Sequence, residues 1–351
     1  MELSAELGRS LRTRWQRWQK AWSSADGLCA ATDLTKKQLE KYRLTARPYS
    51  PTSLQSYAAC PFRFFLYGIH KLAPREESVP LEVLDPLTRG HLYHAIVAKF
   101  LRAALEKRML PIDRANLPKA HAMVEEALRT TADEYHEQYA PAIERVWQEE
   151  IEVLRADLRG WLTQMSERAD GYIPELIEFA FGLASADGRD PASTSHYATV
   201  PDGFLIHGVI DLVEKNSCAQ VRITDHKTGK NRTEDGMVIG GGEVLQPVLY
   251  SLSIEDLQKI SVREARLSYC TAAGGYSERT VAMDDISRQS AIDVLRTIDQ
   301  AIASGCLPAA PKEDGCKWCD FVQVCGPYEE LRTSRKEQNV LKQLIEIREL
   351  P

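Results

Sequence analysis

The segment HGVIDLVEKNSCAQVRITDHKTGK, at residues 207–230, constrains the fold more than any other part of the sequence. Two apolar runs flank a polar turn, and this pattern predicts an antiparallel β-hairpin. A hairpin that folds about Cys218 places Asp211 opposite Asp225, with their Cβ atoms about 4.5 to 5.5 Å apart. Lys227, two residues after Asp225, then projects from the same face. A shift of one residue in the register would separate these side chains.

Two adjacent carboxylates repel each other unless a cation or a shared proton relieves them. The pair therefore predicts either a divalent metal site or a carboxylate dyad, and Lys227 favours the metal. A metal held in this way can bind a phosphate oxygen and activate water, while a nearby ammonium group stabilises developing negative charge. The alternative interpretation is a surface hairpin with a salt bridge, which would contribute little to stability.

The composition is that of a folded globular protein. Of the 351 residues, 44% are hydrophobic and 27% are charged, which excludes a disordered, collagen-like or fibrous chain. The formal net charge of −6 provides no overall basic field, so nucleic acid would have to be bound locally. No apolar run approaches the length of a membrane span, and the N-terminal residues lack the apolar core of a signal peptide. We therefore expect a cytoplasmic protein with no membrane partner.

The order of sequence patterns predicts helices first and a mixed α/β region afterwards. Residues 4–24 form an amphipathic pattern whose apolar stripe is expected to pack against the protein, with nucleic-acid contact by its arginines as the alternative. A helix capped by Thr52 or Ser53 is expected to be interrupted at Pro61. The remaining helices are expected at about 88–170, 245–257, 287–302 and 328–349. The expected strands lie at 177–181, 204–213, 221–224 and 267–270.

The hairpin carries two short motifs. Gly208 and Asp211 form G-x-x-D, and the run that begins at Asp225 forms D-x-K-T-G. These motifs resemble the catalytic core of PD-(D/E)XK nucleases of the RecB type. Two flanking motifs agree with the resemblance: G-x-x-x-H is matched by Gly90 and His94, and Q-x-x-x-Y is matched by Gln246 and Tyr250. A spacing of four residues places the last two side chains on one face of a helix.

The resemblance implies a role for each matched residue. It implies a Mg²⁺ or Mn²⁺ ion bound by His94, Asp211, Asp225 and the backbone carbonyl of His226. It also implies that Asp211, Asp225 and Lys227 are catalytic, with Lys227 as the cation, and that Gln246 and Tyr250 frame the phosphate. His91, one turn before His94, could compete for the ligand role, and Glu178 resembles a glutamate on the first strand of relatives.

Three cysteines near the C-terminus form the pattern C-x2-C-x5-C, at Cys316, Cys319 and Cys325. Their segment is too short for a core of its own, so a shared metal or cluster is expected to stabilise it. Cys60 is the expected fourth ligand, because one branch of the same family has one cysteine before the nuclease core and three after it. Four thiolates suit either Zn²⁺ or a [4Fe-4S] cluster, and the resemblance favours the cluster. No function is assigned to the remaining cysteines, which are Cys29, Cys218, Cys270 and Cys306.

The resemblance implies a mixed α/β fold with a restriction-endonuclease-like core, in which helices flank a central mixed sheet. We expect a helical lead and linker at 1–48, a nuclease domain at 49–328 and a C-terminal helix at 329–351. Within the nuclease domain, a helical insertion is expected at about 95–170, the catalytic core at about 171–300 and the cysteine-bound segment at about 305–328. The chain carries no phosphate-binding loop of an ATPase motor, so any helicase would be another domain or subunit.

These patterns lead to one main function and two alternatives. The main prediction is a metal-dependent DNA exonuclease that prefers single-stranded ends, similar to the nuclease domain of AddB-type helicase-nucleases in recombination and repair. The alternatives are a non-catalytic DNA-end-binding module of a helicase complex and a zinc-stabilised scaffold. Single-stranded DNA is expected to contact Arg63, Lys230 and Arg232, together with Lys71 and the aromatic residues at 62–67. The alternative is that most of these aromatic residues belong to the hydrophobic core.

Overall fold

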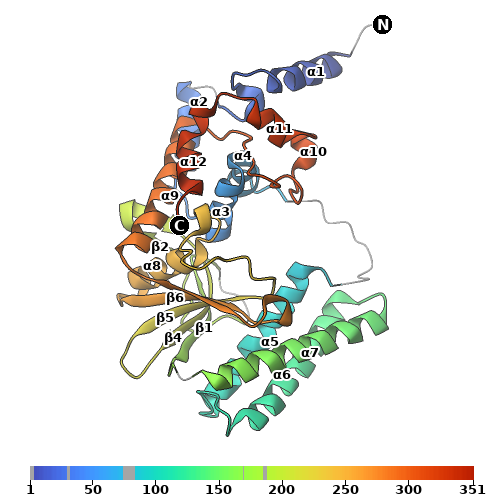
Figure 1. The fold of residues 1–351 in the computed structure, drawn as a ribbon, viewed down its shortest axis with the longest axis vertical. Coiled ribbons are helices and arrows are strands. Elements are labelled where there is room, and N and C mark those ends of the chain that lie inside the picture. Colours follow the sequence, from blue (N-terminus) through green and yellow to red (C-terminus); the bar gives the residue numbers. More distant parts are fainter. Residues whose placement is uncertain (1–3, 30–31, 74–83, 169, 185–187) are drawn as a thin grey trace.

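A mixed β-sheet lies in the middle of the molecule (Figure 1). The computed structural model describes residues 4–29, 32–73, 84–168, 170–184 and 188–351. Within this described part, the sheet has five strands in the order β1-β4-β5-β6-β7. Their bounds are Ile173–Phe181, Gly208–Lys215, Val221–Lys227, Val262–Tyr269 and Glu278–Ala282. A small antiparallel pair, β2 (Ala198–Val200) and β3 (Phe204–Ile206), lies apart from this sheet. The expected fold class, a mixed sheet flanked by helices, is confirmed.

The direction of the strands follows from their connections. The β4–β5 hairpin is antiparallel, as are the pairs β1–β4 and β6–β7. Strands β5 and β6 are parallel, because helix α8 (Gln246–Gln258) crosses over between them. This crossover helix packs against both strands that it connects.

Three long helices cover one face of the sheet: α5 (Pro86–Glu106), α6 (Leu117–Tyr139) and α7 (Glu144–Glu167). The carboxylate of Asp85 caps α5 by accepting hydrogen bonds from the N–H groups of Leu87 and Thr88, and Pro86 occupies the first helical turn. The apolar stripe of α7 is buried and joins a core that includes Ile177 of β1 and Leu212 of β4. These helices form the lower end of the molecule in Figure 1.

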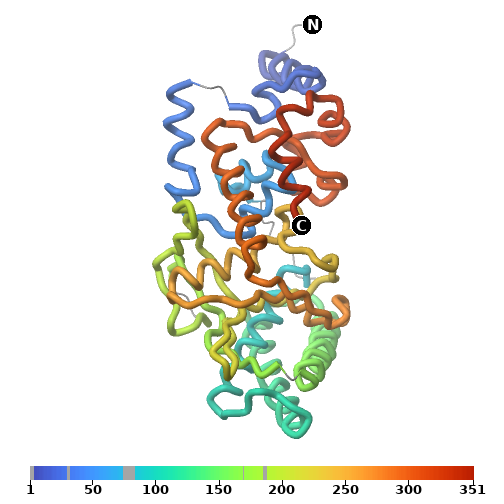
Figure 2. The backbone as a smooth tube through the Cα atoms, turned by 60° about the vertical axis from the view of Figure 1, so that its left-hand side comes forward, coloured from blue at the N-terminus to red at the C-terminus, as the bar shows by residue number. Residues whose placement is uncertain are grey.

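The other face of the sheet packs against α8, α9 (Asp285–Ser304) and α3 (Pro51–Ala59). Beyond them lies an end layer built from the two ends of the chain, on the side opposite to α5–α7 (Figure 2). Its helices are α1 (Ala5–Arg17), α2 (Asp33–Glu40), α4 (Pro61–Phe64), α10 (Val322–Cys325), α11 (Glu329–Ser334) and α12 (Lys342–Arg348). A fully buried ion pair of 2.8 Å between Asp26 and Lys336 joins the two ends.

Four details of the expected secondary structure are wrong. The first helix ends at Arg17, and its stripe is exposed rather than packed, with Trp15 64% accessible. The hydroxyl of Ser50, and not of Thr52 or Ser53, caps α3. The expected last helix is two separate helices, α11 and α12.

The expected interruption before Pro61 is confirmed. Extended backbone at Cys60 separates α3 from α4.

Candidate active site

The β4–β5 hairpin has the register that the sequence predicts. Leu212 lies opposite Thr224, and Val213 lies opposite Ile223, so the hairpin folds about Cys218. The ladder ends one pair before Asp211 and Asp225, but the backbone N–H of His226 donates a 2.6 Å hydrogen bond to the Asp211 carboxylate. This bond fixes Asp211 to β5 beside Asp225.

A local irregularity in β1 brings Glu178 to the same place. Glu178 has a φ of 57°, an unusual value for a residue other than glycine. Its neighbours Ile177 and Phe179 contribute to the hydrophobic cores on opposite faces of the sheet, so the strand changes face at this residue. The pairing of β1 with β4 likewise skips Glu178 and Asp211. Strained backbone of this kind persists only where the surrounding structure enforces it, and here it directs two carboxylates toward helix α5.

His94 completes a group of three possible metal ligands. Its Nδ1 atom lies 3.3 Å from Asp211 Oδ1 and 3.8 Å from Glu178 Oε1. Burial opposes the charged imidazole, but the two carboxylates outweigh it and raise the pKa of His94 well above its ordinary value. One nitrogen and two carboxylate oxygens, all within 4.8 Å of one another, suit a divalent ion. His91 is exposed on the same helix and does not belong to this group.

Glu178 is therefore the residue whose importance the sequence understated. Its resemblance to a first-strand glutamate was the available signal, but Glu178 was not included in the predicted ligand set. Alternation along a strand would have placed Glu178 on the face opposite to Ile177 and Phe179. The left-handed backbone at this position overrides that alternation, and sequence patterns do not reveal it.

Asp225 and Lys227 form a second, buried part of the site. The Lys227 Nζ atom lies 2.7 Å from Asp225 Oδ2 and donates a 2.6 Å hydrogen bond to Gln246 Oε1. Burial, aided by the charge of Asp211, raises the pKa of Asp225 despite the nearby ammonium group. Apart from this ion pair with Lys227, Asp225 Oδ2 has no hydrogen-bond partner among the described residues.

The electrostatic balance keeps Lys227 positively charged. Burial alone would lower its pKa, but Asp225 and then Asp211 raise the pKa above its ordinary value. Burial also opposes ionisation of Asp211, yet the charge of His94 lowers the pKa of that carboxyl. The pKa values of the two aspartates therefore shift in opposite directions. Asp211 pairs with His94, and Asp225 pairs with Lys227.

Helix α8 supplies Gln246 and Tyr250 from one face, one turn apart. Tyr250 is buried, and a Cβ atom on Gly208 would lie only 2.8 Å from its ring. The glycine of the G-x-x-D motif therefore allows α8 to pack closely against β4. Burial, followed by the charge of Asp225, raises the pKa of the Tyr250 phenol, which remains neutral.

The side chain of His226 faces the helical insertion. Its ring lies 6.0 Å from the ring of Trp161 on α7 at an interplanar angle of 89°. Burial lowers the pKa of His226 to about 4, so this imidazole is neutral at neutral pH. The role assigned to its backbone carbonyl as a metal ligand remains a prediction.

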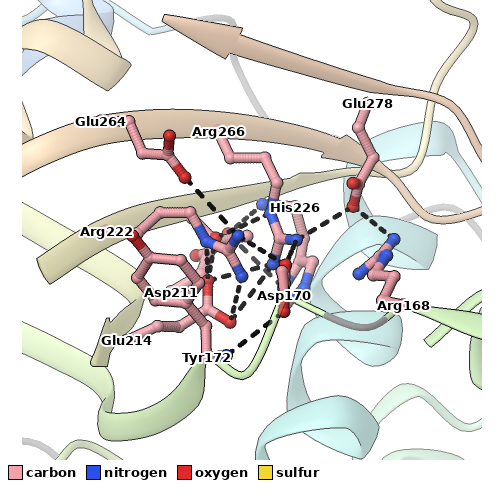
Figure 3. Close-up of polar contacts among 11 residues, drawn as sticks. Arg168, Asp170, Tyr172, Asp211, Glu214, Arg222, His226, Glu264, Arg266 and Glu278 are labelled. Carbon is pink, nitrogen blue, oxygen red and sulfur yellow. Dashed lines mark hydrogen bonds and ion pairs between the residues drawn. The ribbon is translucent and has the colours of Figure 1, made fainter. Parts of the chain in front are cut away.

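A buried ionic cluster lies beside the hairpin (Figure 3). Glu214 accepts hydrogen bonds of 3.0 Å from both Arg222 and Arg266, and also contacts Thr224. Arg222 in turn pairs with Asp170 at 2.7 Å. The cluster links β4, β5 and β6 next to His226 and Asp211, and such a satisfied network holds its members in one arrangement.

The metal-ligand group opens into a cavity of about 1200 Å³ between the helical insertion and the sheet. His94, Glu178, Asp211 and Lys227 line it, together with residues of α5 and α6. Gly90, the glycine of the upstream motif, lies at its wall near Thr228. A substrate that enters this cavity reaches the ligand group directly.

The four cysteines named from the sequence also converge. Cys60, Cys316, Cys319 and Cys325 line one small cavity with apolar neighbours that include Phe321. Among the described residues, no three cysteine sulfur atoms all lie within 4.8 Å of one another. Burial raises the pKa of the Cys60 thiol to about 11.

The predicted DNA-binding residues lie elsewhere. Arg63 lines the cysteine cavity, and Lys230 and Arg232 follow β5 in a loop outside the lining of the large cavity. Of the aromatic residues near Arg63, Phe64 is fully buried and Phe65 packs against the core. Phe64 is therefore a core residue, as in the alternative interpretation, whereas Tyr67 is exposed.

Comparison with known proteins agrees with this geometry. Residues 48–326 match the PD-(D/E)XK nuclease superfamily. The chain belongs to this superfamily. Membership implies metal-dependent nuclease activity with DNA as substrate, and PD-(D/E)XK nucleases usually use Mg²⁺ or Mn²⁺.

Other comparisons add little. A solved structure entitled "Crystal structure of SSO0001" is 13% identical, with a TM-score of 0.28, over 78% of this chain and 94% of that chain. This similarity is too low to indicate a shared fold or function. None of the curated proteins matches the chain. Among the described helices of this PD-(D/E)XK protein, none is long and apolar enough to cross a membrane.

Proposed function

We propose that this PD-(D/E)XK protein is a DNA exonuclease that hydrolyses phosphodiester bonds, preferentially at single-stranded ends. One observation carries the proposal: His94, Glu178 and Asp211 meet beside the Asp225–Lys227 pair at a large cavity. A scaffold protein would gain nothing from burying so many charges in one place, because each costs desolvation energy. Charged groups with shifted pKa values in a cavity are typical of an active site.

The side chains have distinct roles in this reaction. His94, Glu178, Asp211 and Asp225, with the His226 carbonyl, would hold Mg²⁺ or Mn²⁺. The bound ion supplies Lewis-acid activation of the phosphate and of water. Lys227 remains an ammonium group, and its bond to Gln246 aims it at the charge that develops on the phosphate.

The proposed enzyme prefers single-stranded DNA and acts at its ends. The ligand group lies between the helical insertion and the sheet rather than on an open face, which supports a flexible strand as substrate. The likeness to AddB-type nucleases further supports work beside a helicase domain or subunit in recombination or repair.

We also propose that Cys60, Cys316, Cys319 and Cys325 bind a [4Fe-4S] cluster, with Zn²⁺ as the alternative. Their shared cavity supports one bound group, and the likeness to the cluster-bearing branch of the family favours iron and sulfur over zinc. Cys60 precedes the sheet and the other three follow it, so the cluster would close the catalytic unit into a loop. Its role would be structural.

The test is degradation of end-labelled single-stranded DNA with Mg²⁺ or Mn²⁺. Asp225→Ala and Lys227→Ala are expected to abolish a metal-dependent activity of the wild type. Lys215→Ala, at the exposed end of β4, is the matched control and is expected to retain activity. If the wild type binds DNA but cuts it with neither metal, a DNA-end-binding module replaces the enzyme.

A further inference from the structure

The cations that line the large cavity are already engaged. Lys99 pairs with Glu134 at 3.0 Å, and Arg189 pairs with Glu178 at 2.7 Å. Lys227 pairs with Asp225, and Arg102 donates hydrogen bonds to backbone carbonyls. Among the described lining residues, carboxylates equal these cations in number. These side chains therefore give the cavity no excess of positive charge, and contacts to the bases would add to the affinity for a nucleic acid strand.

Two tyrosines of the insertion line the same cavity. Tyr135 and Tyr139 are one turn apart on α6, so both project from one face of the helix. Their ring centroids are 5.4 Å apart, and the planes are inclined at 64°. Both rings are half-buried against the core of the insertion, which limits their motion while they remain open to the cavity.

Both rings lie on the same cavity wall, in contact with each other. The charges of Glu178 and Arg189 act on the Tyr135 phenol, so Tyr135 lies near a residue of the metal-ligand group. Tyr139 is the last residue of α6, one turn farther along the helix.

We propose that Tyr135 and Tyr139 form a stacking ledge for unpaired DNA bases and align the strand with the metal site. This inference rests on the proposed function and adds the origin of its preference for single strands. Aromatic rings stack on any base, but only unpaired bases expose their faces. The ledge would add to the affinity for the strand without sequence preference.

Binding of a fluorescent single-stranded oligonucleotide, measured by anisotropy with Ca²⁺ present, tests the ledge. Replacing both tyrosines by leucine keeps an apolar side chain against the core and is expected to weaken binding about tenfold. Replacing both by phenylalanine is expected to preserve binding, because the ring remains. Tyr197→Ala is the control, since Tyr197 is exposed and does not line the cavity.

An abasic strand of the same length distinguishes stacking from other losses. The wild type is expected to bind it as weakly as the leucine variant binds the normal strand. An equal loss of affinity by the leucine variant for both strands, or wild-type binding that ignores the bases, overturns the ledge. The wild type could bind the normal strand more tightly than the abasic strand, lose this difference in the leucine variant, and yet never cut DNA. That result would support the ledge and contradict the exonuclease.

Discussion

The Nδ1 atom of His94 on helix α5 lies 3.3 Å from the Oδ1 atom of Asp211 on strand β4. Helices α6 and α7 and strands β1, β2 and β3 separate the two residues along the chain. The helical layer of α5, α6 and α7 is therefore part of the site, because α5 carries the histidine. Its packing on Ile177 and Leu212 determines where His94 lies.

Loss of a carboxylate from the ligand group is expected to weaken metal binding. Asp211→Asn and Glu178→Gln should each lower Mn²⁺ affinity about tenfold or more, as measured by calorimetry on the folded protein. Glu175→Gln changes an exposed glutamate on the same strand and should have no effect. Unchanged affinity in Glu178→Gln would remove Glu178 from the ligand set.

The cysteine cavity predicts a loss of stability without its bound group. Cys60→Ser and Cys316→Ser should release iron and sulfide and lower the unfolding temperature by about 3 °C or more, roughly 2 kcal/mol in a chain of this size. The exposed Cys218 provides a control, since its serine variant should keep both the metal content and the stability. Zinc in fresh wild-type protein, with neither iron nor sulfide, would contradict the cluster.

The buried pair of Asp26 and Lys336 predicts a strongly non-additive double substitution. Asp26→Ala leaves an unpaired buried ammonium group and should cost about 3 to 5 kcal/mol in urea unfolding. Combining Asp26→Leu with Lys336→Met removes both charges and should recover most of this loss. Additive losses would indicate that the pair is accessible to solvent.

Glu214 predicts a stability that depends on pH. Burial opposes its ionisation, but Arg266 and Arg222 prevail and lower its pKa to about 2, from an ordinary 4.5. Because the folded pKa is depressed, the contribution is complete well above pH 4.5 and declines as the pH falls toward 2. The stability difference between wild type and Glu214→Gln should therefore shrink by about 1 kcal/mol from pH 7 to pH 3.5. A constant difference across this range, in urea unfolding, would contradict the shift.

Local patterns were sufficient for the hairpin. Alternating apolar residues and the polar turn at Cys218 predicted the register that places Asp211 beside β5. Hairpin register depends on neighbouring residues, so a short sequence contains the needed information. Helical periodicity similarly predicted the helices of the insertion, although their bounds came from the structure.

Local patterns failed where distant packing decides. The apolar stripe of α1 predicted packing, yet Trp15 is exposed, since periodicity does not show whether a partner surface exists. The phenylalanines near Cys60 suggested a DNA path, but Phe64 lies in the core. Tyr135 and Tyr139 belong to no sequence motif. Their place in the cavity wall depends on how α6 packs.

The sequence by itself determined the superfamily motifs, the hairpin register and the C-x2-C-x5-C group, because short spacings encode these features, while Cys60 was named from the resemblance. Only the tertiary structure decided that Glu178 joins His94 and Asp211, since a left-handed backbone turns that residue out of the strand alternation. It also decided which partners the cations of the cavity have. Ion pairs between distant segments depend on how helices and sheet pack, and no local pattern records that packing.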